Sequence, residues 1–91
     1  MFNCYILRSL KTARRYVGSC EDLESRVYRH NAGKVNATKH GAPWVLVHAE
    51  SFVTRAEAVR RERYYKTGAG RDEVDRIVAR IYPPPLESSN E

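Results

Sequence analysis

The sequence NCYILRSLKTARRYVGS, residues 3–19, decides the fold of this chain. Its two ends, Asn3–Arg8 and Arg15–Ser19, are short runs rich in tyrosine, isoleucine, leucine and valine, which are residue types that favour β-strands. The polar segment that joins them is too short for anything but a hairpin turn. We therefore expect two adjacent antiparallel strands, which bring Tyr5 and Tyr16 close together.

The rest of the chain predicts one more strand and three helices. The dense apolar run Trp44–Phe52 is typical of a strand. Helical spacing of apolar residues marks the other segments, which we place at Glu21–Asn31, Thr54–Lys66 and Arg71–Ile81. In the second of these, Thr54 and Glu57 form a capping box at the start of the helix. The order β-β-α-β-α-α predicts an α/β fold of the α+β sandwich kind, with a small central three-stranded, mainly antiparallel sheet flanked by helices.

Length and composition fit one domain with one core. The chain has 91 residues, of which 42% are hydrophobic. We place the domain at residues 1–81 and expect residues 82–91, YPPPLESSNE, to form a flexible proline-rich tail. No apolar run approaches the ~20 residues that span a bilayer, and the N-terminus does not resemble a signal peptide. A cytoplasmic protein without membrane contact is therefore expected, with Cys4 and Cys20 as reduced, mostly buried thiols.

The charge of the chain predicts a polyanionic partner. The formal net charge is +5 and the pI is near 9.5. Of the 16 lysines and arginines, 14 lie within residues 1–71. A basic body of this kind fits nucleic acid most simply.

One glutamate occupies an unexpected position in the second predicted helix. Glu62 shares a helix face with Ala58, Val59 and Tyr65, so it should point inward among apolar neighbours. An ionised carboxylate removed from water needs a compensating cation. That cation is either a bound metal ion or a basic side chain, and the candidates are Arg26, His30, Arg61 and Arg63. A carboxylate, an arginine, a histidine and several tyrosines in a basic chain point to phosphate-ester chemistry.

Taken in order, these residues resemble the GIY-YIG nuclease family. Two tyrosine motifs on neighbouring strands read Cys4-Tyr5-Ile6 and Tyr16-Val17-Gly18, and the next helix supplies Arg26 and His30. A later helix supplies Glu62, so that the match runs from about Phe2 to Lys66. The pattern is most similar to small stand-alone bacterial members described as excinuclease-like. The chain departs from it at Cys4, where the family has glycine, and at Ser19, where some members have lysine. An asparagine that some members carry beyond the glutamate has no counterpart.

The resemblance implies a nuclease that hydrolyses DNA phosphodiester bonds in repair, recombination or processing. It implies one divalent ion, Mg²⁺ or Mn²⁺, on Glu62, which suits hard cations that take few protein ligands. Arg26 would clamp the phosphate, a task that fits its planar fork. Tyr5 or Tyr16 would act as the base, with no ranking between the two. His30 would orient a tyrosine or relay its proton.

Other basic side chains are candidate contacts to the nucleic-acid backbone, and such contacts give binding that weakens with salt. They are Arg14, Arg15, Lys34, Lys39, Arg60 and Lys66. Lys66 has a second possible role, the support of Glu62 from one helical turn away. The remaining aromatic residues are expected to pack in the core rather than stack on bases: Tyr28, Trp44, Tyr64, Tyr65 and Tyr82.

Two alternatives to an active nuclease remain open at this point. One is a non-catalytic nucleic-acid-binding module, and the other is a subunit that joins a larger repair complex. A single basic face indicates modest sequence specificity or recognition of structure, such as single strands, flaps, branches or ends. The sequence does not separate single-stranded from duplex or branched substrates. It leaves open whether the substrate is DNA or RNA, and it leaves the oligomeric state open.

Overall fold

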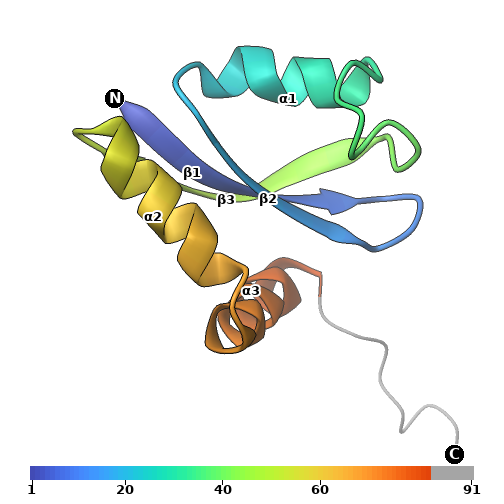
Figure 1. Ribbon diagram of the computed structural model, residues 1–91. Helices are drawn as coiled ribbons and strands as arrows, with labels where there is room; N and C mark the ends of the chain where they lie inside the picture. Colours follow the sequence, from blue (N-terminus) through green and yellow to red (C-terminus); the bar gives the residue numbers. More distant parts are fainter. Residues whose placement is uncertain (83–91) are drawn as a thin grey trace, which may run out of the picture.

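The structure is a computed structural model that describes residues 1–82 (Figure 1). Two strands come first, β1 (Phe2–Ser9) and β2 (Arg15–Cys20), followed by helix α1 (Leu23–Asn31) and strand β3 (Trp44–Phe52). Helices α2 (Arg55–Tyr65) and α3 (Gly68–Ile81) complete the fold. The strands form one antiparallel sheet in the order β2-β1-β3. The predicted fold class and element order are confirmed.

The helices cover both faces of the sheet, α1 on one and α2 with α3 on the other (Figure 1). Side chains of a strand alternate between the two faces, and β1 supplies a buried residue to each in turn. Cys4 and Ile6 belong to the core under α2 and α3. Tyr5 and Leu7 belong to the core under α1. The central strand therefore links two cores, and β2 is left at an edge of the sheet.

Capping side chains set the helix boundaries, and two of them differ from the prediction. Helix α1 begins at Leu23 rather than Glu21, because the Asp22 side chain accepts a hydrogen bond from the Ser25 amide and acts as the N-cap. Helix α3 begins at Gly68 rather than Arg71, because Thr67 caps it in the same way. The capping box predicted for the start of α2 is confirmed.

Trp44, the first residue of β3, holds the loop between α1 and β3 in place through hydrogen bonds to the end of α1 and to the middle of the loop. The Asn31 side chain accepts from the Trp44 amide at 2.6 Å and donates to the Trp44 carbonyl at 3.0 Å. The indole of Trp44 donates to the carbonyl of Thr38 at 2.8 Å. Trp44 is buried, as its predicted packing role requires. These bonds hold Thr38 beneath the C-terminal end of α1.

Two tyrosines, Tyr28 and Tyr82, lie in other surroundings than the sequence predicted. Tyr28 is 69% exposed, so its predicted burial is wrong; it lies on the outer face of α1, away from the sheet. Tyr82 was assigned to the tail, yet it packs against the core below the sheet, with the Arg8 guanidinium 4.5 Å from its ring centre. The remainder of the predicted tail, 83–91, lies outside the described residues. Tyr65 is buried and Tyr64 is half-buried, as expected.

Both cysteines are free and buried. Burial raises the pKa of the Cys4 thiol to about 12, and the nearby carboxylates of Glu50 and Glu62 add to the rise. The thiol is therefore protonated and inert at neutral pH.

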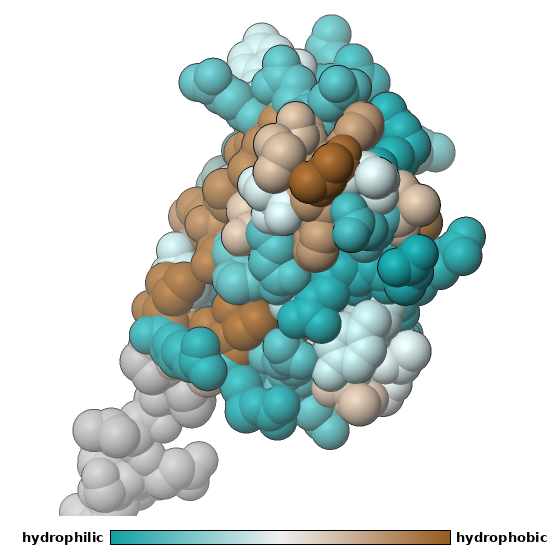
Figure 2. All heavy atoms as spheres, turned by 90° about the vertical axis from the view of Figure 1, so that its left-hand side faces the viewer, coloured by the Kyte–Doolittle hydropathy of each residue, from teal (hydrophilic) through white to brown (hydrophobic). Residues whose placement is uncertain are grey.

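The surface combines apolar and hydrophilic areas. Figure 2 shows apolar side chains gathered in a band on the side where the chain begins, bordered by hydrophilic ones. Exposed apolar residues include Met1, Leu46 and Val53. Among residues 1–82, no helix is long and apolar enough to cross a membrane.

Candidate active site

The core under α1 contains a buried hydrogen-bonded chain of three side chains. The hydroxyl of Tyr5 lies 2.9 Å from Nε2 of His30, and Nδ1 of His30 lies 2.7 Å from Oγ1 of Thr38. Since Thr38 directs its own proton to the Val35 carbonyl, its oxygen accepts from Nδ1. We therefore assign Nε2 as the acceptor of the Tyr5 proton. The structure thus unites Tyr5 and His30, and adds Thr38, which no sequence pattern indicated.

Burial keeps the side chains of Tyr5 and His30 neutral at pH 7. Burial raises the pKa of Tyr5, as does the nearby Tyr16, while the charge of Arg26 opposes the rise. Burial also lowers the pKa of His30, and the charges of Arg26 and Arg29 lower it further. The phenol therefore keeps its proton, the imidazole stays uncharged, and the hydrogen bond between them joins two neutral groups.

Tyr16 lies beside this chain but differs from Tyr5 in its access to solvent. Its ring centre is 4.9 Å from that of His30 and 6.3 Å from that of Tyr5. Tyr5 is fully buried, whereas Tyr16 is half-buried. Gly18 on the same strand leaves room for Tyr5, because a Cβ there would lie 2.6 Å from the Tyr5 hydroxyl. Gly18, the glycine of the second tyrosine motif, thus leaves the space that Tyr5 of the first motif occupies.

Glu62 lies on the opposite face of the sheet from the tyrosines. Its side chain is 21% exposed. Oε1 accepts from the Ser19 hydroxyl at 2.7 Å, and Oε2 pairs with the Lys66 ammonium at 2.7 Å. The cations expected to compensate Glu62 from within the protein were wrong. Arg26 and His30 belong to α1 on the other face of the sheet, and Arg61 pairs with Glu50 and Glu73 instead. Arg63 forms no ion pair with Glu62. The predicted support from Lys66 is present.

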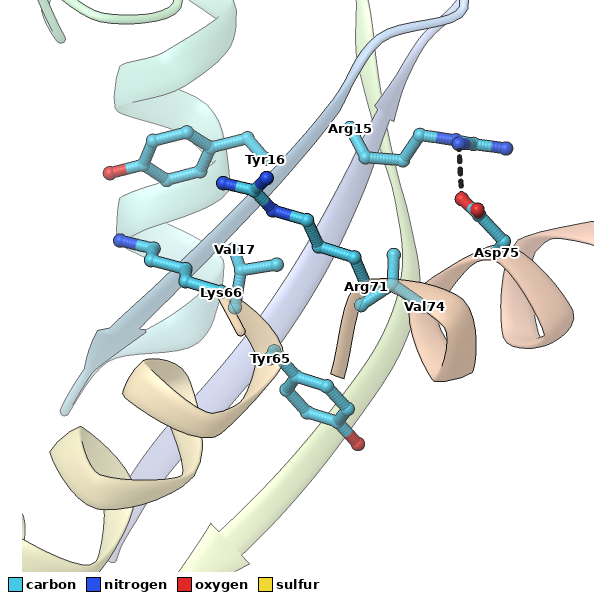
Figure 3. A pocket seen from close by; sticks show the side chains of 8 residues that line it. All are labelled: Arg15, Tyr16, Val17, Tyr65, Lys66, Arg71, Val74 and Asp75. Carbon is cyan, nitrogen blue, oxygen red and sulfur yellow. Dashed lines mark hydrogen bonds and ion pairs between the residues drawn. The ribbon is translucent and has the colours of Figure 1, made fainter. Parts of the chain in front are cut away.

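The two halves of the site meet around the open edge of β2. Ser19, which donates to Glu62, lines a hollow of about 400 Å³ together with Arg26. Among residues 1–82, Arg26 forms no ion pair. Tyr16 and Lys66 line a second hollow of about 430 Å³ (Figure 3). The two hollows share no lining residue, but Glu62 bonds to Ser19 in one and to Lys66 in the other. We call the two hollows together with Glu62 the rim.

The predicted phosphate contacts divide between this rim and other surfaces. Arg15 and Lys66 line the hollow beside Tyr16, and Arg14 lines a third hollow that Tyr16 also borders. Lys34 and Lys39 are exposed in the loop after α1. Arg60 borders a separate hollow with Phe52, Glu57, Arg61 and Tyr64. The structure thus gathers Arg14, Arg15 and Lys66 near Tyr16 and leaves Arg60 apart.

A divalent cation could be held here by Glu62. Within residues 1–82, no three His, Cys, Asp or Glu side chains are grouped to hold a metal ion. A cation on Glu62 would keep water as most of its ligands, which suits Mg²⁺ or Mn²⁺ better than a structural zinc. The carboxylate fits such an ion, because the cation that it now binds is the half-exposed ammonium of Lys66, which can move aside.

Sequence reasoning missed Arg71 and the hydrogen-bonded cluster around Glu50. Arg71 borders the hollow beside Tyr16, yet in sequence it is one of many arginines on a helix. Glu50 accepts hydrogen bonds from His48, Arg61 and Tyr65 on the α2 side of the sheet. Alternation along the strand could have placed Glu50 on that face, but not its partners on α2.

Comparison with known proteins identifies the family of this chain. The GIY-YIG catalytic domain model matches residues 1–73. The chain belongs to the GIY-YIG catalytic domain family. The resemblance that the sequence shows to this family is therefore confirmed.

The relatives that match this chain are UPF0213 proteins. The chain is 45% identical over 53 residues to UPF0213 protein SH2523 of Staphylococcus haemolyticus, covering 57% of this chain and 65% of that protein. It is 39% identical over 64 residues to UPF0213 protein SSP2268 of Staphylococcus saprophyticus, covering 69% and 77%. The NMR structure of UPF0213 protein BH0048 from Bacillus halodurans matches with a TM-score of 0.54 and 26% identity, over 91% and 92% of the two chains. The chain thus spans just under two thirds of the first relative.

Proposed function

We propose that this GIY-YIG domain hydrolyses phosphodiester bonds in DNA with the help of one divalent metal ion, and that the cut strand lies along the edge of β2. The observation that carries the proposal is the meeting of the polar motifs at that edge. Ser19 connects Glu62 to the hollow of Arg26, and Lys66 connects it to the hollow of Tyr16. A phosphate bound on this rim would lie near the carboxylate of Glu62, the cations of Arg26 and Lys66, and the phenol of Tyr16.

Solvent access ranks the two tyrosines in this proposal. Tyr5 is fully buried and bonded to His30, so it cannot reach an attacking water without rearrangement. Tyr16 is half-buried and borders two hollows. We therefore assign to Tyr16 the task of orienting the water and acting as the base: its phenolate, formed when the phenol loses its proton to solvent, would take a proton from the attacking water. The chain of Tyr5, His30 and Thr38 positions Tyr16 through ring contacts.

The remaining groups would compensate the negative charge of the DNA strand. Arg26 carries a guanidinium without an acidic partner among the described residues, and it would stabilise the charge that the phosphate gains in the transition state. Glu62 would hold Mg²⁺ or Mn²⁺, and the ion, when bound, would polarise the phosphate and assist the departing oxygen. Lys66, displaced from Glu62, would become free to contact the strand.

Cleavage of labelled DNA tests the proposal. Single-stranded, duplex and branched substrates would be incubated with Mg²⁺, Mn²⁺ or EDTA, with wild type beside Glu62→Gln. The variant should keep its circular dichroism and DNA affinity and lose at least about a hundredfold in rate. Glu24→Gln is the matched control, because Glu24 is an exposed carboxylate on α1 that lines neither hollow of the rim. Wild-type cleavage by Glu62→Gln would contradict the metal assignment.

Tyrosine variants test the ranking in the same assay. Tyr16→Phe should lose cleavage while keeping wild-type stability, because no hydrogen bond of its hydroxyl holds the fold together within residues 1–82. Tyr5→Phe should lose stability as well, since it leaves Nε2 of His30 without its partner. A Tyr16→Phe variant that cuts at the wild-type rate would remove Tyr16 from the base role.

A nucleic-acid-binding module without catalysis is the second candidate. It is favoured by the ion pair of Glu62 with Lys66, which satisfies the carboxylate without any metal. Salt-sensitive binding of DNA with no cleavage of any substrate in either metal would support this candidate.

A further inference from the structure

The hollow beside Tyr16 has two chemically different parts. It lies between β2, the end of α2 and the start of α3, and has a volume of about 430 Å³. Its floor is apolar and is formed by Val17, Val74 and the ring of Tyr65, all of them buried. Its rim is charged and carries Arg15, Lys66, Arg71 and Asp75. We call this site the β2–α3 hollow.

Arg71 gives the rim its free positive charge. Arg15 pairs with Asp75 at 2.6 Å, and Lys66 pairs with Glu62. Arg71 forms no ion pair with any residue of the described chain. Figure 3 shows its side chain extending from α3 across the hollow towards Tyr16, where that of Lys66 also points. A guanidinium in this position can bind an anion without first breaking an ion pair.

The position of Arg71 is fixed by the close packing of α2 and α3. A Cβ at Gly70 would lie 1.9 Å from the Tyr64 carbonyl oxygen, so only glycine allows this approach. The Thr67 side chain caps α3 through the Gly70 amide at 3.1 Å. Arg71 follows directly, and Val74 reaches the floor from the next turn. The same two helices therefore place the charged rim and the apolar floor.

An apolar floor beneath a cationic rim matches the two parts of a nucleotide. A base can cover Val17 and Val74, and its phosphate can take the guanidinium of Arg71. Bases in a duplex are stacked and paired, so their faces are not available for such contact. An unpaired base has a free face. The floor therefore distinguishes unpaired from paired DNA, whereas basic side chains alone would not.

We propose that the β2–α3 hollow binds one unpaired nucleotide beside the phosphate held at Tyr16, and so selects substrates with an unpaired stretch. The inference rests on the proposed nuclease function, because Tyr16 is shared by the hollow and the cleavage site. It assigns to Arg71 the phosphate of the neighbouring nucleotide, and to Val17 and Val74 its base.

Binding without cleavage provides the first test. In the Glu62→Gln background, fluorescence anisotropy would compare a single strand, a duplex and a single strand of abasic residues, all of equal length and at one salt concentration. We expect the single strand to bind about tenfold more tightly than the other two, because only it presents free bases. Equal affinity for all three would overturn the proposal.

A matched pair of arginine variants locates the effect. Arg71→Ala should weaken binding of the single strand about tenfold and leave duplex binding nearly unchanged. Arg80 is exposed on the same helix and does not border the hollow, so Arg80→Ala should change both affinities slightly and equally. Equal losses for Arg71→Ala and Arg80→Ala would overturn the role of Arg71.

Amide chemical shifts in ¹⁵N-labelled protein provide a readout that does not depend on catalysis. A short single-stranded thymidine oligonucleotide should shift the amides of Val17, Arg71 and Val74. Shifts confined to the loop after α1 would overturn the proposal. If these shifts occur while no DNA is cut, the nuclease proposal fails and the hollow stands. If DNA is cut without preference for unpaired strands, the nuclease stands and the hollow fails.

Discussion

The substitution Gly18→Ala tests how Tyr5 is seated against the edge strand. The added Cβ would lie 2.6 Å from the Tyr5 hydroxyl oxygen and 2.8 Å from its Cζ, which is closer than non-bonded atoms approach. Tyr5 has no room to move, because it is fully buried and its hydroxyl is bonded to His30 at 2.9 Å. We expect the free energy of unfolding to fall by about 1–3 kcal/mol, the usual cost of overpacking a core.

Thermal and urea unfolding, followed by circular dichroism, measure this loss. For a chain of this size each kcal/mol lowers Tm by about 4–8 °C. Gly68→Ala is the matched control, because a Cβ at Gly68 meets no atom within 4 Å and the residue lies at the start of α3. That variant should equal or exceed wild-type stability by up to about 1 kcal/mol. Wild-type stability of Gly18→Ala would refute the seating of Tyr5 by Gly18.

A double-mutant cycle with Tyr5→Phe identifies the side chain with which the new alanine clashes. Phenylalanine lacks the hydroxyl and is not held by His30, so it can shift away from the new methyl group. Gly18→Ala should therefore cost less in the Tyr5→Phe background than in wild type, with a coupling energy of at least about 0.5 kcal/mol. Equal costs in the two backgrounds would place the clash at Tyr16, whose Cε2 is 3.0 Å from the added Cβ.

Two further predictions concern stability on the α2 side of the sheet. Burial tends to raise the pKa of Glu50, but hydrogen bonds from Tyr65, His48 and Arg61 outweigh it and lower that pKa below its ordinary value of 4.5. The ionised carboxylate therefore stabilises the fold above about pH 4.5, and this contribution is lost as pH falls through the lowered pKa. Urea unfolding at several pH values should show the loss in wild type and a flatter profile in Glu50→Gln, which at pH 7 should be less stable by about 1–3 kcal/mol. Gly70→Ala should destabilise the protein by more than Gly18→Ala, because its Cβ would meet backbone, the Tyr64 carbonyl oxygen, at 1.9 Å; a smaller loss than that of Gly18→Ala in the same unfolding experiment would contradict the close contact of α2 and α3.

The sequence predicts the elements of this fold well because each is encoded locally. Strand β3 matches its predicted bounds, and the capping box at Thr54 places the start of α2. The errors lie at helix starts, where one side chain decides the boundary. Helix α3 begins at Gly68, three residues before its predicted start at Arg71, because Thr67 caps it. That start depends on the close packing at Gly70.

The site is harder to predict, because helical periodicity gives the face of a residue but not the partner across that face. Glu62 was expected to point inward and does approach the sheet, yet it meets Ser19, 43 positions away, at the edge strand. There it is half-buried and borders solvent through Lys66. Had β2 been the central strand, the tyrosines above it and the carboxylate below would be separated by a sheet. Its place at the edge would let groups from both faces reach one phosphate, as the proposed function requires. The order β2-β1-β3 is set by tertiary packing, and no single stretch of the sequence records it.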